Sequence, residues 1–177
     1  AKDFLRQIHQ RDGCEGLAIY EYDDFIRSCL YQMKGCFDIE LSKIFLERYY
    51  SELKIKYMGY YVVPVPSYIE DDEKRGFKHV IELFKPLNLN MLLVFKKTSH
   101  FKQAEHSGNS RANIEQFIEL INSIELRNKN LLLVDDVFTT GSTIKACIKL
   151  LKQLKPRRIK VLVMSKTPFK KPLAQTN

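Results

Sequence analysis

The chain has 177 residues, of which 45% are hydrophobic and 28% are charged, and its formal net charge is +8. This length suits one domain with a buried core, so we expect a single domain over residues 1–177. No segment has the apolar length of a transmembrane helix and no signal-peptide pattern opens the chain, so we expect a cytoplasmic protein without membrane insertion. Within the domain we expect an N-terminal strand and helices over 1–58, a core over 59–165 and a basic tail over 166–177.

The N-terminal part predicts one strand and two helices. Residues 17–22 alternate in polarity as a half-buried strand does, and Asp23 or Asp24 can cap the helix that follows. A longer helix is expected at about 38–57, where apolar side chains recur at four-residue steps. Ile44 widens the apolar face of this second helix.

The middle of the chain predicts further core strands joined by polar loops. Residues 60–65 are β-branched and aromatic and predict a core strand, after which two prolines demand an abrupt exit. The loop 66–76 contains the acidic run 70–73, which could instead cap a helix beginning near Phe77. Strands are expected at 91–95 and 116–121, with a polar, aperiodic loop between them.

The most informative segment is a short apolar strand followed by acids and hydroxyls. Residues 131–134 predict a central strand of a parallel sheet, with Asp135 and Asp136 at its carboxyl end, where open α/β sheets bind ligands. The turn 139–143 then leads into an amphipathic helix, whose N-terminus is suited to an anion. Taken singly, these features also suit a solvated strand end and a helix cap. The spacing excludes a nucleotide-triphosphate P-loop and a dinucleotide-binding glycine motif.

The C-terminal part is strongly basic. From residue 137 onward there are ten Lys or Arg and no Asp or Glu, whereas the first 136 positions carry 19 basic and 21 acidic residues. This asymmetry suits either a solvated helix face or contact with the phosphates of a nucleic acid. The candidate nucleic-acid contacts are Lys145, Lys149, Lys152, Arg157 and Arg158, with Lys155 on the same stripe.

The cysteines give no sign of a metal site. The chain has four of them, with no C-x-x-C pair and no histidine partner at a metal-ligand spacing. We therefore expect reduced thiols, with Cys147 on the apolar face of its helix, and no zinc in this chain.

The segment DDVFTTGST at 135–143 resembles the signature of type I phosphoribosyltransferases, which bind 5-phosphoribosyl 1-pyrophosphate (PRPP). Other segments resemble the ComF branch of that family, which is associated with competence and DNA uptake. These are PVP at 64–66, RGF at 75–77, Lys97, Gln103, Arg111 and Asn113. The resemblance covers roughly residues 17–165. It implies the α/β type I phosphoribosyltransferase fold, a mainly parallel sheet flanked by helices with a flexible hood loop. The zinc ribbon that often precedes this domain in ComF-like proteins is absent from the chain.

The resemblance also assigns roles to individual residues. Asp135 and Asp136 would contact the ribose hydroxyls of PRPP or ribose 5-phosphate, directly or through Mg²⁺. Lys97 and Arg75 would offset charge on the departing pyrophosphate, whose loop includes Ser67, although the acidic run 70–73 lies where ComF-like sequences usually have basic residues. Val137 is a further ligand-binding residue. Around the 5-phosphate the resemblance places Thr139, Thr140, Gly141, Ser142 and Thr143.

Three functions fit the sequence. The resemblance favours a ComF-type phosphoribosyltransferase, a glycosyltransferase that releases pyrophosphate. Its role would be in DNA uptake and natural transformation, where it would handle incoming single-stranded DNA beside a competence helicase. The chain could alternatively be a non-catalytic module that binds PRPP or nucleic acid, or a nucleobase salvage phosphoribosyltransferase.

Overall fold

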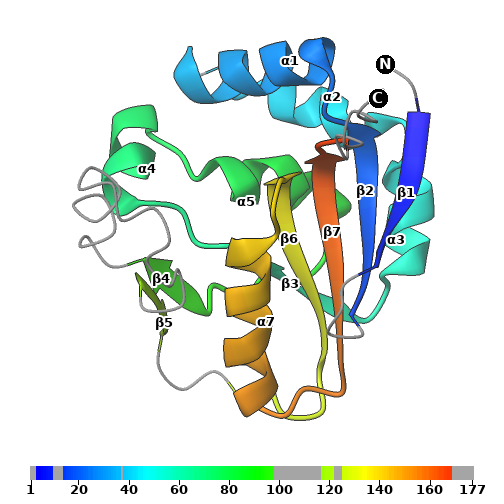
Figure 1. Cartoon of the computed structure of the whole chain (residues 1–177), viewed down its shortest axis with the longest axis vertical. Helices are drawn as coiled ribbons and strands as arrows, with labels where there is room; N and C mark the ends of the chain where they lie inside the picture. Colours follow the sequence, from blue (N-terminus) through cyan, green and yellow to red (C-terminus); the bar gives the residue numbers. More distant parts are fainter. Residues whose placement is uncertain (1–2, 10–13, 37, 98–116, 122–124, 169–177) are drawn as a thin grey trace, which may run out of the picture.

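The centre of the protein is a five-stranded sheet in the order β1-β2-β7-β6-β3 (Figure 1). The structure is a computed structural model that describes residues 3–9, 14–36, 38–97, 117–121 and 125–168. Neighbouring strands from β2 to β3 run parallel, and β1 is antiparallel to β2. A separate antiparallel pair joins β4 and β5. The strands are β1 (Asp3–His9), β2 (Glu15–Glu21), β3 (Tyr60–Pro64), β4 (Phe95–Lys97), β5 (Ile118–Leu120), β6 (Asn130–Phe138) and β7 (Arg158–Lys166).

Helices cover both faces of the large sheet, as the sequence predicts. In Figure 1, α7 lies across one face, and α1 crosses the end of the sheet at which β6 and β7 terminate. The opposite core cluster draws its side chains from α1, α2, α3 and α5. The helices are α1 (Asp24–Gly35), α2 (Leu41–Glu47), α3 (Tyr50–Lys56), α4 (Ile69–Arg75), α5 (His79–Phe84) and α7 (Ser142–Gln153), with the 3-10 turn η1 (Lys85–Leu87).

The central strand β6 is apolar on both sides. Leu131 and Leu133 belong to the core cluster beneath α7, whereas Leu132 and Val134 belong to the cluster beneath the N-terminal helices. All four side chains are fully buried. An uninterrupted apolar run is expected of a parallel strand with helices on both faces, because successive side chains point to opposite sides.

The start of the chain follows the sequence predictions only in part, since β1 was not predicted. The predicted strand at 17–22 is β2, and Asp23 caps α1 by accepting the backbone N–H of Ile26 at 2.8 Å. The long helix predicted at 38–57 is wrong, because the chain forms α2 and α3 with a break at Arg48 and Tyr49. Tyr49 leaves helical geometry (φ −107°, ψ 2°) and packs edge-on against Tyr20, with ring centroids 6.0 Å apart. Tertiary packing therefore overrides the helical period here.

Three other expectations need correction. Ile44 does not widen a buried face, since it is 62% exposed. The strand predicted at 91–95 is shifted, because Met91 makes only an isolated bridge to Val62 and the regular strand is β4. The acidic run 70–73 does not cap the helix near Phe77, since it lies within a helix of its own, α4. Acids favour the positive end of a helix, which accounts for three of them in its first turn.

No helix in the described part of the chain combines the length and apolar character needed to cross a bilayer. The predicted hood loop at 98–113 lies outside the described residues, as does most of the tail beyond residue 168.

Thiol labelling tests the placement of the cysteines. Cys147 is fully buried in α7, and burial raises the pKa of its thiol, whereas Cys36 is exposed. Because the thiolate is the reactive form, we expect a disulfide reagent to modify Cys36 in the native protein and to modify Cys147 only after denaturation. Mass spectrometry of digested samples checks this outcome. Labelling of Cys147 at the rate of Cys36 would contradict this packing of α7.

Candidate functional site

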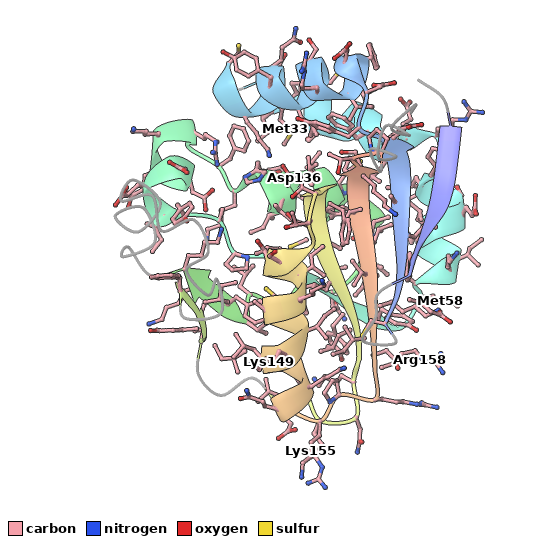
Figure 2. The ribbon with its side chains drawn as sticks, viewed as in Figure 1. Met33, Met58, Asp136, Lys149, Lys155 and Arg158 are labelled. Carbon is pink, nitrogen blue, oxygen red and sulfur yellow. The ribbon has the colours of Figure 1, made fainter. Side chains whose placement is uncertain are left out.

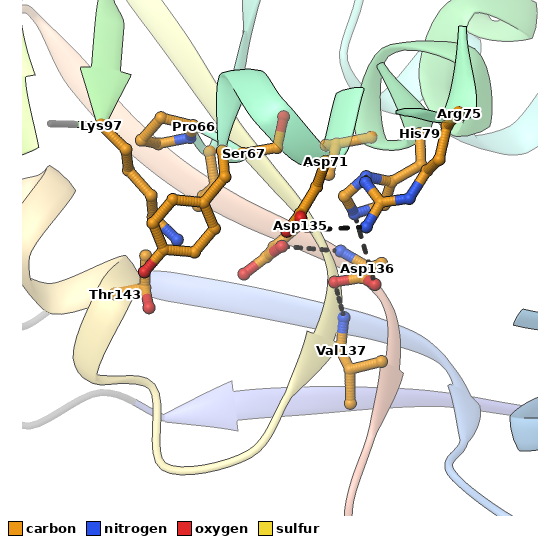
Figure 3. Close-up of a pocket in the computed structure, with 13 residues that line it drawn as sticks. Pro66, Ser67, Asp71, Arg75, His79, Lys97, Asp135, Asp136, Val137 and Thr143 are labelled. Atoms are coloured by element: carbon orange, nitrogen blue, oxygen red, sulfur yellow. Dashed lines mark hydrogen bonds and ion pairs between the residues drawn. The ribbon is translucent and has the colours of Figure 1, made fainter. Parts of the chain in front are cut away.

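A pocket of about 250 Å³ opens at the carboxyl ends of β3 and β6 (Figure 3). Open α/β sheets bind ligands at this edge, where the strands end and the following loops begin. The pocket is lined by Val65, Pro66, Ser67, Tyr68, Asp71, Arg75, His79, Val80, Lys97, Asp135, Asp136, Val137 and Thr143. It therefore brings together the acids, Ser67, Arg75 and Lys97 that the sequence assigns to one site.

The two adjacent acids point in different directions. β6 does not end before them, since its parallel register with β7 continues to Phe138. In a strand, neighbouring side chains lie on opposite faces. Asp135 accordingly follows Leu131 and Leu133 toward α7, and Asp136 follows Leu132 and Val134 toward α1 and α5. Figure 3 shows Asp135 on the side of Lys97 and Thr143, and Asp136 on the side of His79.

Asp135 lies in the pocket on the side of Lys97 and Thr143 (Figure 3). One of its oxygens accepts the backbone N–H of Asp136 at 2.9 Å. Burial raises the pKa of Asp135 to about 7, against the opposing effect of the positive charges of Lys34 and Lys97. A carboxyl group with this pKa can accept a hydrogen bond or share a proton near neutral pH, which suits contact with a sugar hydroxyl.

Asp136 is bound from within the protein. Its side chain is 10% exposed, its Oδ1 accepts the backbone N–H of Val137 at 2.8 Å, and its Oδ2 forms an ion pair with Lys34 of α1. Nε2 of His79 lies 3.6 Å from the same Oδ2. The sequence analysis missed Lys34 and His79. No pattern in the sequence marks Lys34 as a site residue, because it lies about a hundred positions before Asp136 in a helix with no motif.

Arg75 is held by neighbouring side chains. Its guanidinium lies 3.5 Å from Asp72 and 3.9 Å from Asp71, and Nη1 lies 3.3 Å from Nδ1 of His79. Asp72 in turn accepts a hydrogen bond from the Ser67 hydroxyl. Burial and the charges of Lys34, Arg75 and Lys97 lower the pKa of His79 to about 3, so its imidazole is neutral at pH 7. The predicted pyrophosphate residues Ser67 and Arg75 are thus at the pocket but already engaged with the acidic run.

The hydroxyl turn before α7 is open to solvent. Thr139, Thr140 and Ser142 are exposed, and the Thr140 and Ser142 hydroxyls lie 2.8 Å apart. Gly141 is the residue before α7 and has φ +72°, a conformation that favours glycine. Thr143, in the first turn of α7, is the member of this turn that lines the pocket. The positive end of a twelve-residue helix therefore faces the cleft.

Lys97 extends into the pocket from β4. Its ammonium lies 4.5 Å from the centroid of the Tyr68 ring, a distance typical of a cation–π contact. This contact fixes the lysine at the side of the cleft nearest Asp135 and Thr143 (Figure 3). The position agrees with the predicted role of Lys97 toward an anion.

The resemblance implied magnesium at Asp135 and Asp136 by way of the ribose or PRPP, and that expectation stays a prediction. The two acids by themselves do not fit a divalent cation held by both carboxylates. Three of the four carboxylate oxygens are engaged, two with backbone N–H groups and one with the ammonium of Lys34. Within the described residues, no cluster of three or more His, Cys, Asp or Glu side chains is placed to hold a metal ion. One oxygen of Asp136 thus already has a positively charged partner, Lys34.

The candidate nucleic-acid residues form a separate basic surface. Figure 2 shows Lys149, Lys155 and Arg158 toward the end of the molecule opposite Asp136. We call this set the distal basic surface, although Lys145, near the start of α7, is its member nearest the cleft. All of its members are exposed: Lys145, Lys149, Lys152, Lys155, Arg157 and Arg158.

Comparison with known families identifies the fold. Residues 76–173 match the family described as the phosphoribosyl transferase domain. The chain belongs to this family. The match begins after Arg75 and includes α5, β6, α7 and β7, whereas Lys34 and α1 lie outside it. The mainly parallel sheet flanked by helices that the resemblance implied is confirmed.

Individual relatives agree with this assignment. The chain is 27% identical over 148 residues to the competence protein ComFC of Streptococcus pneumoniae (strain ATCC BAA-255 / R6). This alignment covers 84% of the chain but 66% of ComFC, so the chain spans slightly less than two thirds of that relative. The chain is thus a ComFC-like member of the phosphoribosyl transferase family.

Solved structures with similar folds include two hypoxanthine phosphoribosyltransferases. The enzyme from Trypanosoma cruzi is 13% identical with a TM-score of 0.49, and the alignment covers 78% of this chain and 74% of that one. The enzyme from Staphylococcus aureus is 18% identical with a TM-score of 0.48, over 73% of this chain and 65% of that one.

Substitution of Gly141 tests the geometry of the hydroxyl turn. A Cβ added there would lie 2.6 Å from the Phe138 ring, in addition to the strain of φ +72°. Gly59→Ala is the matched control, because Gly59 has φ +80° but nothing within 4 Å of an added Cβ. We expect Gly59→Ala to lower the free energy of unfolding by about 1–2 kcal/mol. Gly141→Ala should cost roughly 1–3 kcal/mol more, because of the overpacking.

Denaturant unfolding of both variants and the parent protein measures this difference. Equal losses of unfolding free energy in the two variants would show that the Phe138 ring does not pack against Gly141 as described.

Proposed function

We propose that this protein binds PRPP or ribose 5-phosphate in the cleft between β3 and β6. The observation that supports this most directly is that Asp135, Lys97 and Thr143 line one pocket at the N-terminus of α7. A carboxylate can accept the ribose hydroxyls while the helix N-terminus receives the 5-phosphate. Magnesium enters this proposal as a counter-ion of the pyrophosphate.

The arrangement suits a phosphoryl-sugar ligand better than a free nucleotide base. Its anion-binding groups, the turn before α7 and Lys97 of β4, lie on the same side of the pocket as Asp135, so a phosphorylated ribose can meet the carboxyl group and these groups together (Figure 3). In a transfer reaction, the bond from C1 to pyrophosphate breaks while the acceptor bonds to C1. Lys97 would then stabilise the departing pyrophosphate. Arg75 would have to leave Asp71 and Asp72 before it could contact pyrophosphate. We therefore propose PRPP binding first, and turnover is to be tested separately.

Isothermal titration calorimetry with PRPP and Mg²⁺ tests the ligand. We expect saturable binding to the full chain. Asp135→Asn should weaken it at least about tenfold, because a hydrogen bond to a charged acceptor is lost. Asp38→Asn, an exposed substitution away from the cleft, should leave the affinity unchanged. The absence of binding to the parent protein, or equal affinity in Asp135→Asn, would refute the proposal.

Pyrophosphate release distinguishes the three candidate activities. Release with a free nucleobase would favour salvage, and release with another acceptor would favour a different transferase reaction. Binding without release over a panel of bases and amines would favour a non-catalytic module. Arg75 lies beside the carboxylates of Asp71 and Asp72 and is therefore less available to a departing pyrophosphate, which favours slow turnover or none.

A role in competence is a second proposal. The name of the ComFC relative suggests it, and the distal basic surface supports it, because its six exposed cations come with no Asp or Glu after residue 136. We propose that this surface contacts the phosphates of incoming single-stranded DNA during uptake and natural transformation, in the cytoplasm and beside a competence helicase. Since it lies away from Asp136, DNA and a ligand in the cleft could be bound together (Figure 2).

Salt-dependent binding to a single-stranded oligonucleotide tests this role. The triple variant Lys145→Ala, Lys149→Ala, Lys152→Ala should weaken binding and reduce the slope of log K against log salt by roughly two, because each phosphate contact releases a counter-ion. The triple variant Lys43→Ala, Lys56→Ala, Lys85→Ala changes the net charge equally at exposed positions elsewhere. Fluorescence anisotropy gives the affinities. Equal effects of the two triple variants would show that only net charge matters.

A further inference from the structure

Lys34 lies in the last turn of α1, at the edge of the helix that faces the sheet. The inner face of α1 is anchored by Ile26, Leu30 and Met33, all of which are buried. Met33, next to Lys34, lies directly above the end of β6 that carries Asp136 (Figure 2). The helix therefore brings an ammonium group to Asp136 from a part of the chain outside the family match.

The ion pair formed there is largely removed from solvent. The side chain of Lys34 is 30% exposed and that of Asp136 is 10% exposed, and the ammonium contacts Oδ2 directly. Burial lowers the pKa of Lys34 to about 8, so the group remains mostly protonated at pH 7. A buried carboxylate without a positive partner is costly, so this ammonium compensates a charge that β6 places in the core.

The partners of the two acids differ as a result. Asp136 has one oxygen on a backbone N–H and the other on Lys34, with His79 beside it. Asp135 accepts one backbone N–H and, among the described residues, makes no ion pair. Adjacent carboxylates at a ligand site would ordinarily attract a divalent cation between them, because hard cations prefer oxygen ligands.

We propose that Lys34 is a resident counter-ion, which occupies at Asp136 the place of a divalent cation and leaves Asp135 as the single acid presented to the ribose. The ribose part of this inference rests on the function proposed above. A metal ion at Asp136 would have to displace a partly buried ammonium and leave it without its carboxylate, so the ion pair excludes the metal from this acid. Lys34 is in this sense a positioning residue, since it acts through Asp136.

Binding of Mn²⁺ alone, measured by the loss of the free-ion electron paramagnetic resonance signal, tests the proposal without PRPP. Lys34→Met removes the ammonium and keeps an unbranched apolar stem. We expect this variant to bind Mn²⁺ at least about tenfold more tightly than the parent chain, because the charge of Asp136 is then uncompensated. Lys34→Arg should restore the weak binding of the parent, since it keeps the positive charge.

Two controls locate the effect. Lys43→Met removes an exposed lysine that pairs with Glu40 and should leave Mn²⁺ binding unchanged. Adding Asp136→Asn to Lys34→Met should abolish the gain. If Lys34→Met does not fold, Lys34→Gln provides the same comparison with a polar side chain. Equal Mn²⁺ affinity in the parent and the Lys34 variant, or a gain that survives Asp136→Asn, would overturn the proposal.

The outcomes also separate this inference from the proposed function. If the parent chain binds PRPP but Lys34→Met shows no gain of Mn²⁺ binding, the proposed ligand stands and the counter-ion proposal fails. If Lys34→Met shows the gain but the parent chain binds no PRPP, the counter-ion proposal stands and the proposed ribose site fails.

Discussion

The site depends on the fact that β6 remains a regular strand through its two acids. Its register with β7 continues to Phe138, the carbonyl of Asp136 accepts the Ser165 hydroxyl at 3.3 Å, and that of Phe138 accepts the N–H of Thr167 at 3.1 Å. These contacts hold the backbone in the pleated conformation, in which neighbouring side chains must diverge. Asp135 and Asp136 thus belong to different faces of the sheet, and each meets the groups that cover its own face.

This divergence gives the N-terminal helices a part in the site. Asp136 is directed into the layer formed by α1 and α5, where an uncompensated carboxylate would be strongly unfavourable. Lys34 of α1 supplies the compensating charge, and His79 of α5 stays neutral beside it. The family match covers residues 76–173, yet the positive partner of Asp136 comes from α1, outside that match. Helix α1 is therefore coupled to the signature motif through this ion pair as well as through the packing of its apolar face.

A second network ties the loop after β3 to the same place. Ser67 and Arg75 both contact Asp72, and Arg75 also reaches His79. This network holds Arg75 against the protein's own carboxylates, which explains how an acidic helix is accommodated beside a site predicted to bind an anion. In the proposed function, a pyrophosphate group competes with Asp71 and Asp72 for Arg75, so ligand affinity and turnover depend on the same carboxylates. Lys97, held against Tyr68, is the cation on the side of Asp135.

The sequence by itself determined the central strand, the position of the acids near its carboxyl end, the hydroxyl turn with Gly141, a cap of α1 by Asp23 or Asp24, and the parallel sheet with helices on both faces. These follow from local rules, namely the apolar run, capping chemistry and the order of strands and helices. The sequence placed the acids after a strand at 131–134, whereas β6 continues through them to Phe138. Only the tertiary structure decided the break between α2 and α3, the capture of Arg75 by the acidic run, and the pairing of Lys34 with Asp136. Each of these results from contacts between segments distant in sequence or from packing that outweighs local periodicity. Strand geometry dictates that adjacent acids point to opposite faces of the sheet, but the partners of each acid depend on how the whole chain folds around the sheet.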